Sequence, residues 1–323
     1  MRKLGTTALA LVLAAGCFPQ AADDSEFKSA IPPENSIQIA VPGGSQAIVQ
    51  PGQPGVGSHD EALLGQTADF YAITRLTSER INGDVGFVLA VLWTIVHYPA
   101  SSVSGNTAVW GPFTPTLSPV NYQLVVTKVA QGQFTYHLDG RPKASTSSAD
   151  FQAIISGSAA PSTPVGRGSG NFELNLTVAH QLDPVGTMGQ GTVDVTYDFG
   201  SNPKTIQVHF ANVADASDQP VTADYIYDHF DDDSGDFQFD AHGNMVGSAT
   251  QLEDGIIRSR WNASGAGRAD ARVSGGDAGT GLTATECWDS NFQRVYFQTQ
   301  PAIVQTEGVA TACVYADQLL PNM

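Results

Sequence analysis

Hydrophobic residues recur at two different spacings along this 323-residue chain, and the change from one to the other divides it. Phe70, Ile73 and Leu76 follow one another at three-residue steps, which predicts an amphipathic helix. An Asn-Gly pair at 82–83 interrupts this pattern before a second helical segment over residues 85–98, which the following proline ends. The sequence therefore predicts two consecutive helical segments.

The second segment has almost no polar face, so it must be buried nearly all round. A helix of this length would extend about 21 Å, short of the roughly 30 Å of hydrocarbon that a membrane span crosses. We therefore expect a core helix. If the surrounding sheet leaves space beside it, the side chains lining that cavity are Phe87, Leu89, Leu92, Trp93 and Val96.

After residue 112 the pattern changes to apolar residues at every second position, broken by Gly, Asn, Asp and Ser. The clearest runs are 172–178, 193–199 and 206–210. About ten to twelve strands with no further helix predict a mainly β, α+β fold: a large curved antiparallel meander sheet, or an open barrel, wrapping the apolar helix. In shape this is similar to the helix-plus-half-barrel fold of periplasmic lipoprotein carriers, a resemblance that no motif carries.

Two hairpins can be aligned from their own residues. Pairing Phe230 with Asp236 across a five-residue turn places most of the aromatic side chains on one face. Pairing Asn262 with Arg268 does the same for the next hairpin. These registers are predictions about which side chains lie opposite one another.

The N-terminus has the features of an export signal. Two basic residues precede an apolar stretch over 4–13, and Ala14-Ala15-Gly16-Cys17 follows. This end resembles the lipobox of bacterial lipoproteins, which implies cleavage before Cys17 and attachment of a diacylglyceryl group to that residue. The alternative is an ordinary cleaved leader in which Cys17 has no such role.

The predicted organisation has three parts: a signal peptide over 1–16, a lipidated flexible tether over 17–58, and a single helix-plus-sheet domain over 59–323. The tether follows from scattered Pro and Gly and from the absence of a sustained period. In lipoproteins of this type, an aspartate directly after the lipidated cysteine retains the protein at the inner membrane. This chain has Phe18 at that position, which would not act as such a signal. We therefore expect lipid anchoring in the bacterial cell envelope, at the outer membrane rather than the inner one.

The charge balance excludes nucleic acid as a partner. Removing Arg2 and Lys3 with the leader leaves 13 basic residues against 32 acidic ones, a net charge near −19. Such a surface repels phosphate backbones. The chain has three cysteines, and outside the lipobox these are Cys287 and Cys313, which we expect to pair in an oxidising compartment. The alternative is two buried thiols.

A cluster of acidic residues over 228–240 is the main candidate for metal chemistry. Asp228, Asp231, Asp233 and Asp236 could supply oxygen ligands for Ca²⁺, although the spacing does not match an EF-hand. The alternative is a solvated hairpin tip, because aspartate favours turns. Otherwise we expect no cofactor.

Four arginines, Arg258, Arg260, Arg268 and Arg272, also stand out in so acidic a chain. The predicted register sets Arg258 opposite Arg272, which requires an anion or neighbouring carboxylates between them. Two interpretations of these arginines are open. They form salt bridges with nearby aspartates, or they form an anion-binding patch.

None of the common enzyme motifs occurs in the chain, neither a nucleophile elbow nor a phosphate loop nor a zinc-protease helix. The leading hypothesis is a non-enzymatic lipoprotein that binds a lipid or another apolar molecule between helix and sheet. The second is a structural or surface-interaction lipoprotein with a filled core. A metal enzyme using Asp228, His229 and Asp240 is a distant third.

Overall fold

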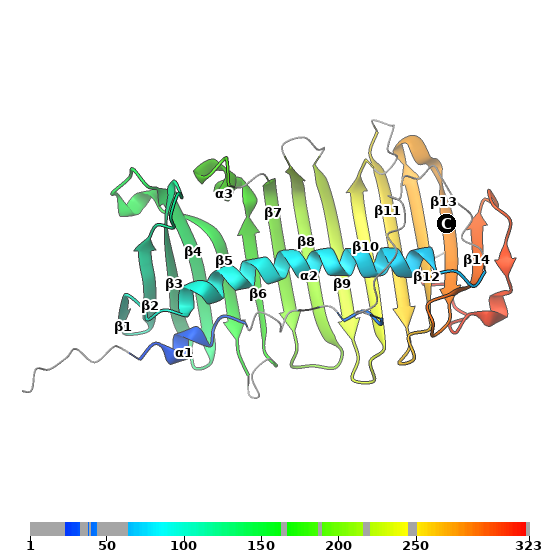
Figure 1. Ribbon diagram of the computed structural model, residues 1–323, viewed down its shortest axis with the longest axis horizontal. Coiled ribbons are helices and arrows are strands. Elements are labelled where there is room, and N and C mark those ends of the chain that lie inside the picture. The colour runs from blue at the N-terminus through cyan, green and yellow to red at the C-terminus, as the bar shows by residue number, and fades with distance from the viewer. Residues whose placement is uncertain are drawn as a thin grey trace, which may run out of the picture.

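The chain folds into one open antiparallel sheet crossed by a long helix (Figure 1). The computed structural model describes residues 23–32, 38, 40–43, 64–162, 167–186, 189–215, 220–244 and 251–320, without the side chains of Asp84, Phe87 and Asp215. Within these residues, 15 strands lie in sequence order from β1 to β15, each paired with its neighbours in the chain. The predicted mainly β, α+β meander is confirmed, and the sheet does not close into a barrel.

The strands begin just after the long helix and continue almost to the C-terminus. They are β1 (Ser102–Ser104), β2 (Thr107–Phe113), β3 (Val120–Ala130), β4 (Gln133–Pro142), β5 (Gln152–Ala160), β6 (Ser169–Asn175), β7 (Gly189–Asp198), β8 (Lys204–Asp215), β9 (Val221–His229), β10 (Gly235–Gly243), β11 (Glu253–Trp261), β12 (Gly267–Gly275), β13 (Gly279–Trp288), β14 (Arg294–Gln300) and β15 (Glu307–Gly308).

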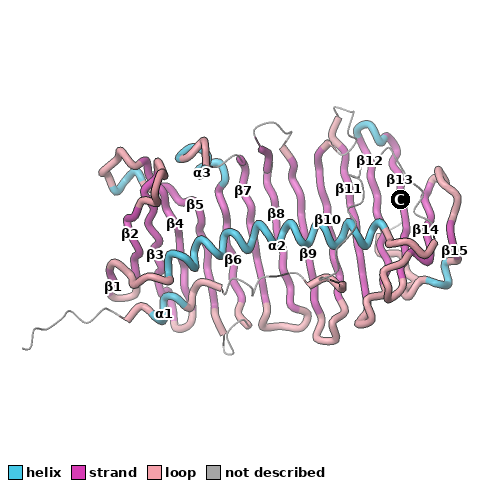
Figure 2. Tube along the Cα trace, in the orientation of Figure 1, coloured by secondary structure: helices cyan, strands magenta, loops and turns pink. Residues whose placement is uncertain are grey.

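The long helix, α2 (Asp69–Val96), is continuous over 28 residues, so the predicted break at 82–83 is wrong. Gly83 is exposed, and a methyl group added there would meet nothing. Packing of both halves of the helix against one sheet outweighs the modest cost of a glycine in a helix. Figure 2 shows α2 running across the strands without a break. None of the helices in the described part of the chain has the length and apolar character needed to cross a membrane.

The two faces of the sheet differ in what covers them. We call the face in contact with α2 the helix face: Thr74 of α2 hydrogen-bonds Ser259 there, at 2.6 Å between the two hydroxyl oxygens. Side chains alternate along a strand, so Arg258 and Arg260 point the other way. We call that side the polar face.

A buried carboxylate holds the start of α2. The residue before the helix, Ala68, offers no side-chain cap. Instead Glu286 of β13, which is fully buried, accepts the backbone N–H groups of Asp69 at 3.1 Å and Phe70 at 2.5 Å. Arg294 of β14 pairs with Glu286 at 2.6 Å. The sheet therefore supplies the hydrogen-bond acceptor that the first N–H groups of the helix require.

The predicted tether over 17–58 is wrong for the parts of it that are described. Residues 23–32 include a short helix, α1 (Ser25–Lys28), whose Phe27 is buried beside Phe134 of β4. Further along, Tyr227 of β9 donates a hydrogen bond to the carbonyl of Ala40 at 2.8 Å. The described residues 23–32 and 40–43 thus pack onto the helix face through apolar side chains that show no regular spacing in the sequence.

One further helix replaces part of a predicted strand. The run 172–178 was expected to be a single strand, but β6 ends at Asn175 and α3 (Leu176–Leu182) follows. The Asn175 side chain accepts the backbone N–H of Val178 at 3.0 Å, an N-cap that begins the helix. The expectation of no second helix after the strands begin is therefore also wrong.

The register of both predicted hairpins is wrong by two residues. Gly235 lies opposite His229, and Gly267 lies opposite Trp261, so each five-residue loop begins one position earlier than expected. A shift of two leaves every side chain on its predicted face but changes its partner. The cause lies in the next strand, because the ring of Trp261 covers Gly235 and that of Trp288 covers Gly267.

Candidate functional site

The residues predicted to line a cavity beside the helix are packed into the core instead. Leu89 and Leu92 have 0% of their surface exposed, and Val96 has 1%. Trp93 is partly buried against the same cluster, and its indole N–H donates to the carbonyl of Pro32 at 2.6 Å. The side chain of Phe87 lies outside the described residues. Helix, sheet and the segment 23–32 thus form one apolar cluster at this place.

The four aspartates proposed as calcium ligands lie in different surroundings. Asp228 and Asp236 face each other on the polar face, where Asp228 accepts from Thr205 at 2.6 Å. Asp231 and Asp233 lie in the hairpin loop. Among the residues that the structure describes, no three His, Cys, Asp or Glu side chains converge where they could hold a metal ion. The predicted calcium site is therefore not formed.

The candidate catalytic group is also divided. Asp228 and Asp240 lie on the polar face, whereas His229 follows Asp228 directly in the strand and points to the helix face. The described partner of His229 is Asp233, with 3.7 Å between Nε2 and Oδ1. These three side chains do not form one site.

Cys287 and Cys313 form a disulfide, which confirms the predicted pair. Cys287 lies in β13 and Cys313 follows a 3-10 turn after β15. The bond fixes the start of a C-terminal segment, residues 313–320, which we call the tail.

The tail is held on the polar face by the arginines that stand out in the sequence. Arg268 donates to the carbonyl of Ala316 at 2.9 Å, and Arg258 donates to that of Leu319 at 3.2 Å. The guanidinium of Arg260 lies 5.3 Å from the centre of the Tyr315 ring. Basic residues thus bind backbone oxygens of the tail as well as carboxylates.

The predicted arginine pairing changes with the register. Arg258 lies opposite Asp270, Arg260 lies opposite Arg268, and Arg272 lies opposite Ile256. Arg260 is balanced by Asp236, with 2.7 Å between Nε and Oδ1. Arg268 is balanced by Asp270, and both side chains are about 95% buried, with 6% and 5% exposed. Salt bridges within the sheet therefore account for the like-charged neighbours.

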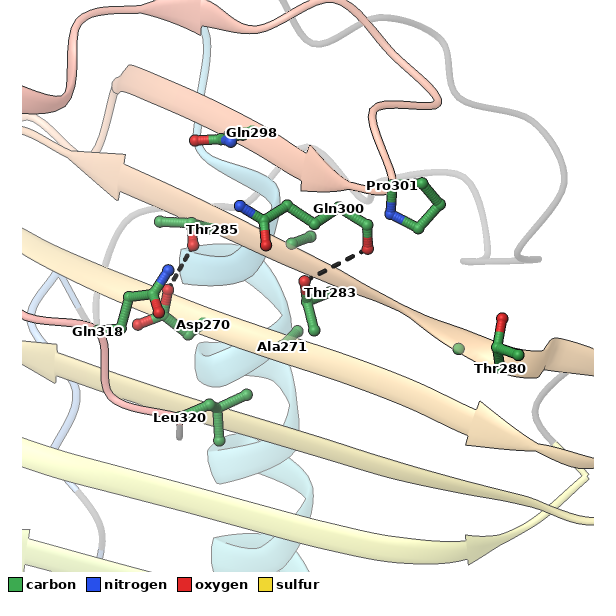
Figure 3. A pocket seen from close by; sticks show the side chains of 12 residues that line it. Asp270, Ala271, Thr280, Thr283, Thr285, Gln298, Gln300, Pro301, Gln318 and Leu320 are labelled. Carbon is green, nitrogen blue, oxygen red and sulfur yellow. Dashed lines mark hydrogen bonds between the residues drawn. The ribbon is translucent and has the colours of Figure 1, made fainter. Parts of the chain in front are cut away.

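A hollow of about 390 Å³ lies between the tail and strands β12 to β14 on the polar face (Figure 3). Its polar lining comes from the sheet, with Thr283, Thr285 and Gln298, and from the tail, with Gln318. Leu320 and Pro301 add apolar surface. A second, smaller hollow of about 240 Å³ lies beneath Tyr315 at the other end of the tail.

Away from the tail, the polar face carries regular rows of hydrogen-bonding side chains. One row of uncharged residues crosses seven neighbouring strands: Thr107, Thr127, Thr135, Ser158, Asn171, Thr196 and Gln207. An adjacent row, which we call the acidic row, crosses β6 to β10: Glu173, Asp194, His209, Asp224 and Asp240. His209 hydrogen-bonds Asp224 at 2.7 Å.

Sequence reasoning missed the hollow, the tail and both rows. Alternation shows that Thr283, Thr285 and Gln298 share the polar sides of their strands, but only the register shows that they are neighbours. The position of the tail had one signal, the predicted disulfide at Cys313.

Comparisons with protein-family models, with curated proteins and with solved structures gave no significant match to this chain. Its function is therefore argued from its own residues.

Proposed function

We propose that this protein is a non-catalytic, surface-interaction lipoprotein of the bacterial cell envelope. Lipid on Cys17 holds it at a membrane, and the polar face of its sheet is the surface it presents to partners. Two features of the sequence support the anchor: the small-residue run that precedes Cys17 and the basic and apolar regions before it.

The observation that carries the proposal is the packing of α2. Leu89 and Leu92 are fully buried within the core cluster, and both described hollows lie elsewhere, with no α2 residue in their linings. An apolar ligand needs a cavity lined by such residues. The filled-core interpretation is therefore the better supported of the two, and a lipid carrier the less supported.

The polar face supports a role in recognition. All three α-helices among the described residues pack on the other side, so broad rows of hydroxyl, amide and carboxylate groups are presented together. With a strongly acidic chain, partners that are neutral or basic are favoured over nucleic acid and anionic lipid.

A Cys17→Ser variant tests the anchor. We expect the wild type to take up radiolabelled palmitate and to sediment with the membrane fraction, and the variant to do neither and to be recovered in soluble envelope material. A variant that stays in the membrane fraction, or a wild type that takes up no label, would overturn the anchor.

A further inference from the structure

We propose that the hollow between the tail and strands β12 to β14 is a binding site for a neutral, polyhydroxylated ligand of the carbohydrate class. This goes beyond the proposed function by naming a ligand and a place on the polar face, and it rests on the assignment of that face as the interaction surface. It does not depend on the anchor.

The charge state of the hollow selects a neutral ligand. Asp270 is the one ionisable residue in its lining. Its Oδ1 accepts from Arg268 at 3.0 Å and from Thr285 at 2.5 Å, and its Oδ2 accepts from Arg268 at 3.0 Å and from the Leu319 backbone at 2.7 Å. A carboxylate offers about four acceptor positions, so those of Asp270 are all used. No free charge is left to pair with a charged ligand.

The remaining polar groups suit a ligand that both donates and accepts hydrogen bonds. Within the described residues, the side-chain amides of Gln300 and Gln318 make no hydrogen bond, and Gln298 accepts one from Tyr296 through its carbonyl oxygen, which leaves its amino group free. Each amide presents two donors and an acceptor. Figure 3 shows Gln298, Gln300 and Gln318 around the same space. Sugar hydroxyls match such an array, because each one donates one hydrogen bond and accepts others.

The site is built by the fold and has an apolar side. The disulfide at Cys313 and the contacts of Arg268 and Arg258 hold the tail in place, so one wall is fixed against the sheet. Pro301, which is exposed, offers surface on which the C–H groups of a sugar ring can pack, whereas Leu320 is buried in the wall of the hollow. A volume of about 390 Å³ falls within the range of small-ligand sites, roughly 300 to 1,000 Å³.

Saturation-transfer difference NMR on the full mature chain tests the site. The chain carries Cys17→Ser so that no glycoside detergent is needed, and the probes are cellotetraose, maltotetraose, mannotetraose and chitotetraose, with tetragalacturonate as a charged comparison. We expect transfer to at least one neutral tetrasaccharide and none to tetragalacturonate. The double variant Gln300→Ala/Gln318→Ala should weaken that binding roughly tenfold or more, from the loss of two hydrogen-bonding amides. Gln207→Ala, in β8 on the same face and outside the hollow, should leave it unchanged.

Three results would overturn the site: no transfer to any of the four neutral probes, preferential transfer to tetragalacturonate, or binding that survives the double variant. All of them would leave the anchor standing, because fractionation of Cys17→Ser reads it separately. A bound fatty acid would count against the filled core and leave this site standing.

Discussion

Four glycines on the helix face lie directly opposite aromatic residues of a neighbouring strand. The pairs are Gly157 with Tyr136, Gly170 with Tyr197, Gly235 with Trp261 and Gly267 with Trp288. In each pair the ring lies over the glycine, where a Cβ would overlap it. The rings are at most 5% exposed, so the missing side chains make room for large buried ones.

Gly267→Ala should destabilise the protein by about 1 to 3 kcal/mol, because the added methyl must displace Trp288 within a packed core. Gly83→Ala is the matched control: that glycine is helical, exposed and surrounded by open space. It should stabilise the protein by about 0.5 to 1 kcal/mol. Urea unfolding measures both changes. Equal effects from the two substitutions would contradict the packing role of Gly267.

Glu286 gives the fold a pH-dependent contact at the start of α2. Burial raises the pKa of its carboxyl from 4.5 to about 7, against the opposing effects of Arg294 and the Phe70 N–H. Between these two values the folded protein holds a proton that the unfolded chain has lost. Stability from this group is therefore full below about pH 4.5 and is lost as pH rises through about 7.

Compared with Glu286→Gln, which does not titrate, the wild type should lose unfolding free energy between pH 4 and pH 8, because burial raises the pKa of the Glu286 carboxyl in the folded state. Denaturant unfolding of both proteins at several pH values gives this difference. A wild type that gains stability over the variant as pH rises would show that attraction to Arg294 dominates instead.

Residue patterns predicted which side chains are buried better than which ones meet. The burial of Leu89 and Leu92 follows from an apolar helix with no polar face. Whether space remains beside them depends on the segment 23–32 and on the rings over the glycines, neither of which has a local signal. The calcium prediction was wrong for the same reason. Asp228 and Asp231 are close in sequence, but Asp228 lies in a strand and Asp231 lies in the loop of the same hairpin.

At the scale of elements, the period of the hydrophobic pattern was a good guide and element boundaries were a poor one. Period two predicted β7 and β8 close to where they lie. The predicted strand was wrong at residues 176–182, where the Asn175 cap begins a helix. The predicted helix break was wrong at Gly83, where packing against the sheet keeps α2 continuous. In both cases a contact in the folded protein decides the secondary structure against the preference of the local sequence.

The tail is the element whose position depends most on a single covalent bond. Replacing Cys287 and Cys313 with alanine should lower stability by roughly 3 kcal/mol, since the bond closes a loop of 26 residues. Hydrogen exchange should become faster in residues 314–320, including the Leu319 amide that donates to Asp270, while peptides from β7 keep their protection. Unchanged protection of the tail would mean that Arg258 and Arg268 hold it without the disulfide.

At the scale of the whole molecule, a meander with sequential neighbours explains how an open sheet of this width is specified. Each strand needs only the turn before it and a one-sided pattern, so the fold class could be predicted from alternation. Closure could not, because it depends on the geometry of all strands together. Here α2, α1 and the segment 40–43 cover the helix face, and the polar face carries the candidate site.

Native mass spectrometry of the full mature Cys17→Ser chain, with and without added palmitate, tests the filled core most directly. We predict a single mass equal to that of the polypeptide with its one disulfide, and no adduct after incubation with the fatty acid. A co-purifying lipid, or stoichiometric uptake of palmitate that Leu92→Trp abolishes, would show that the space beside α2 is a ligand cavity and would contradict it.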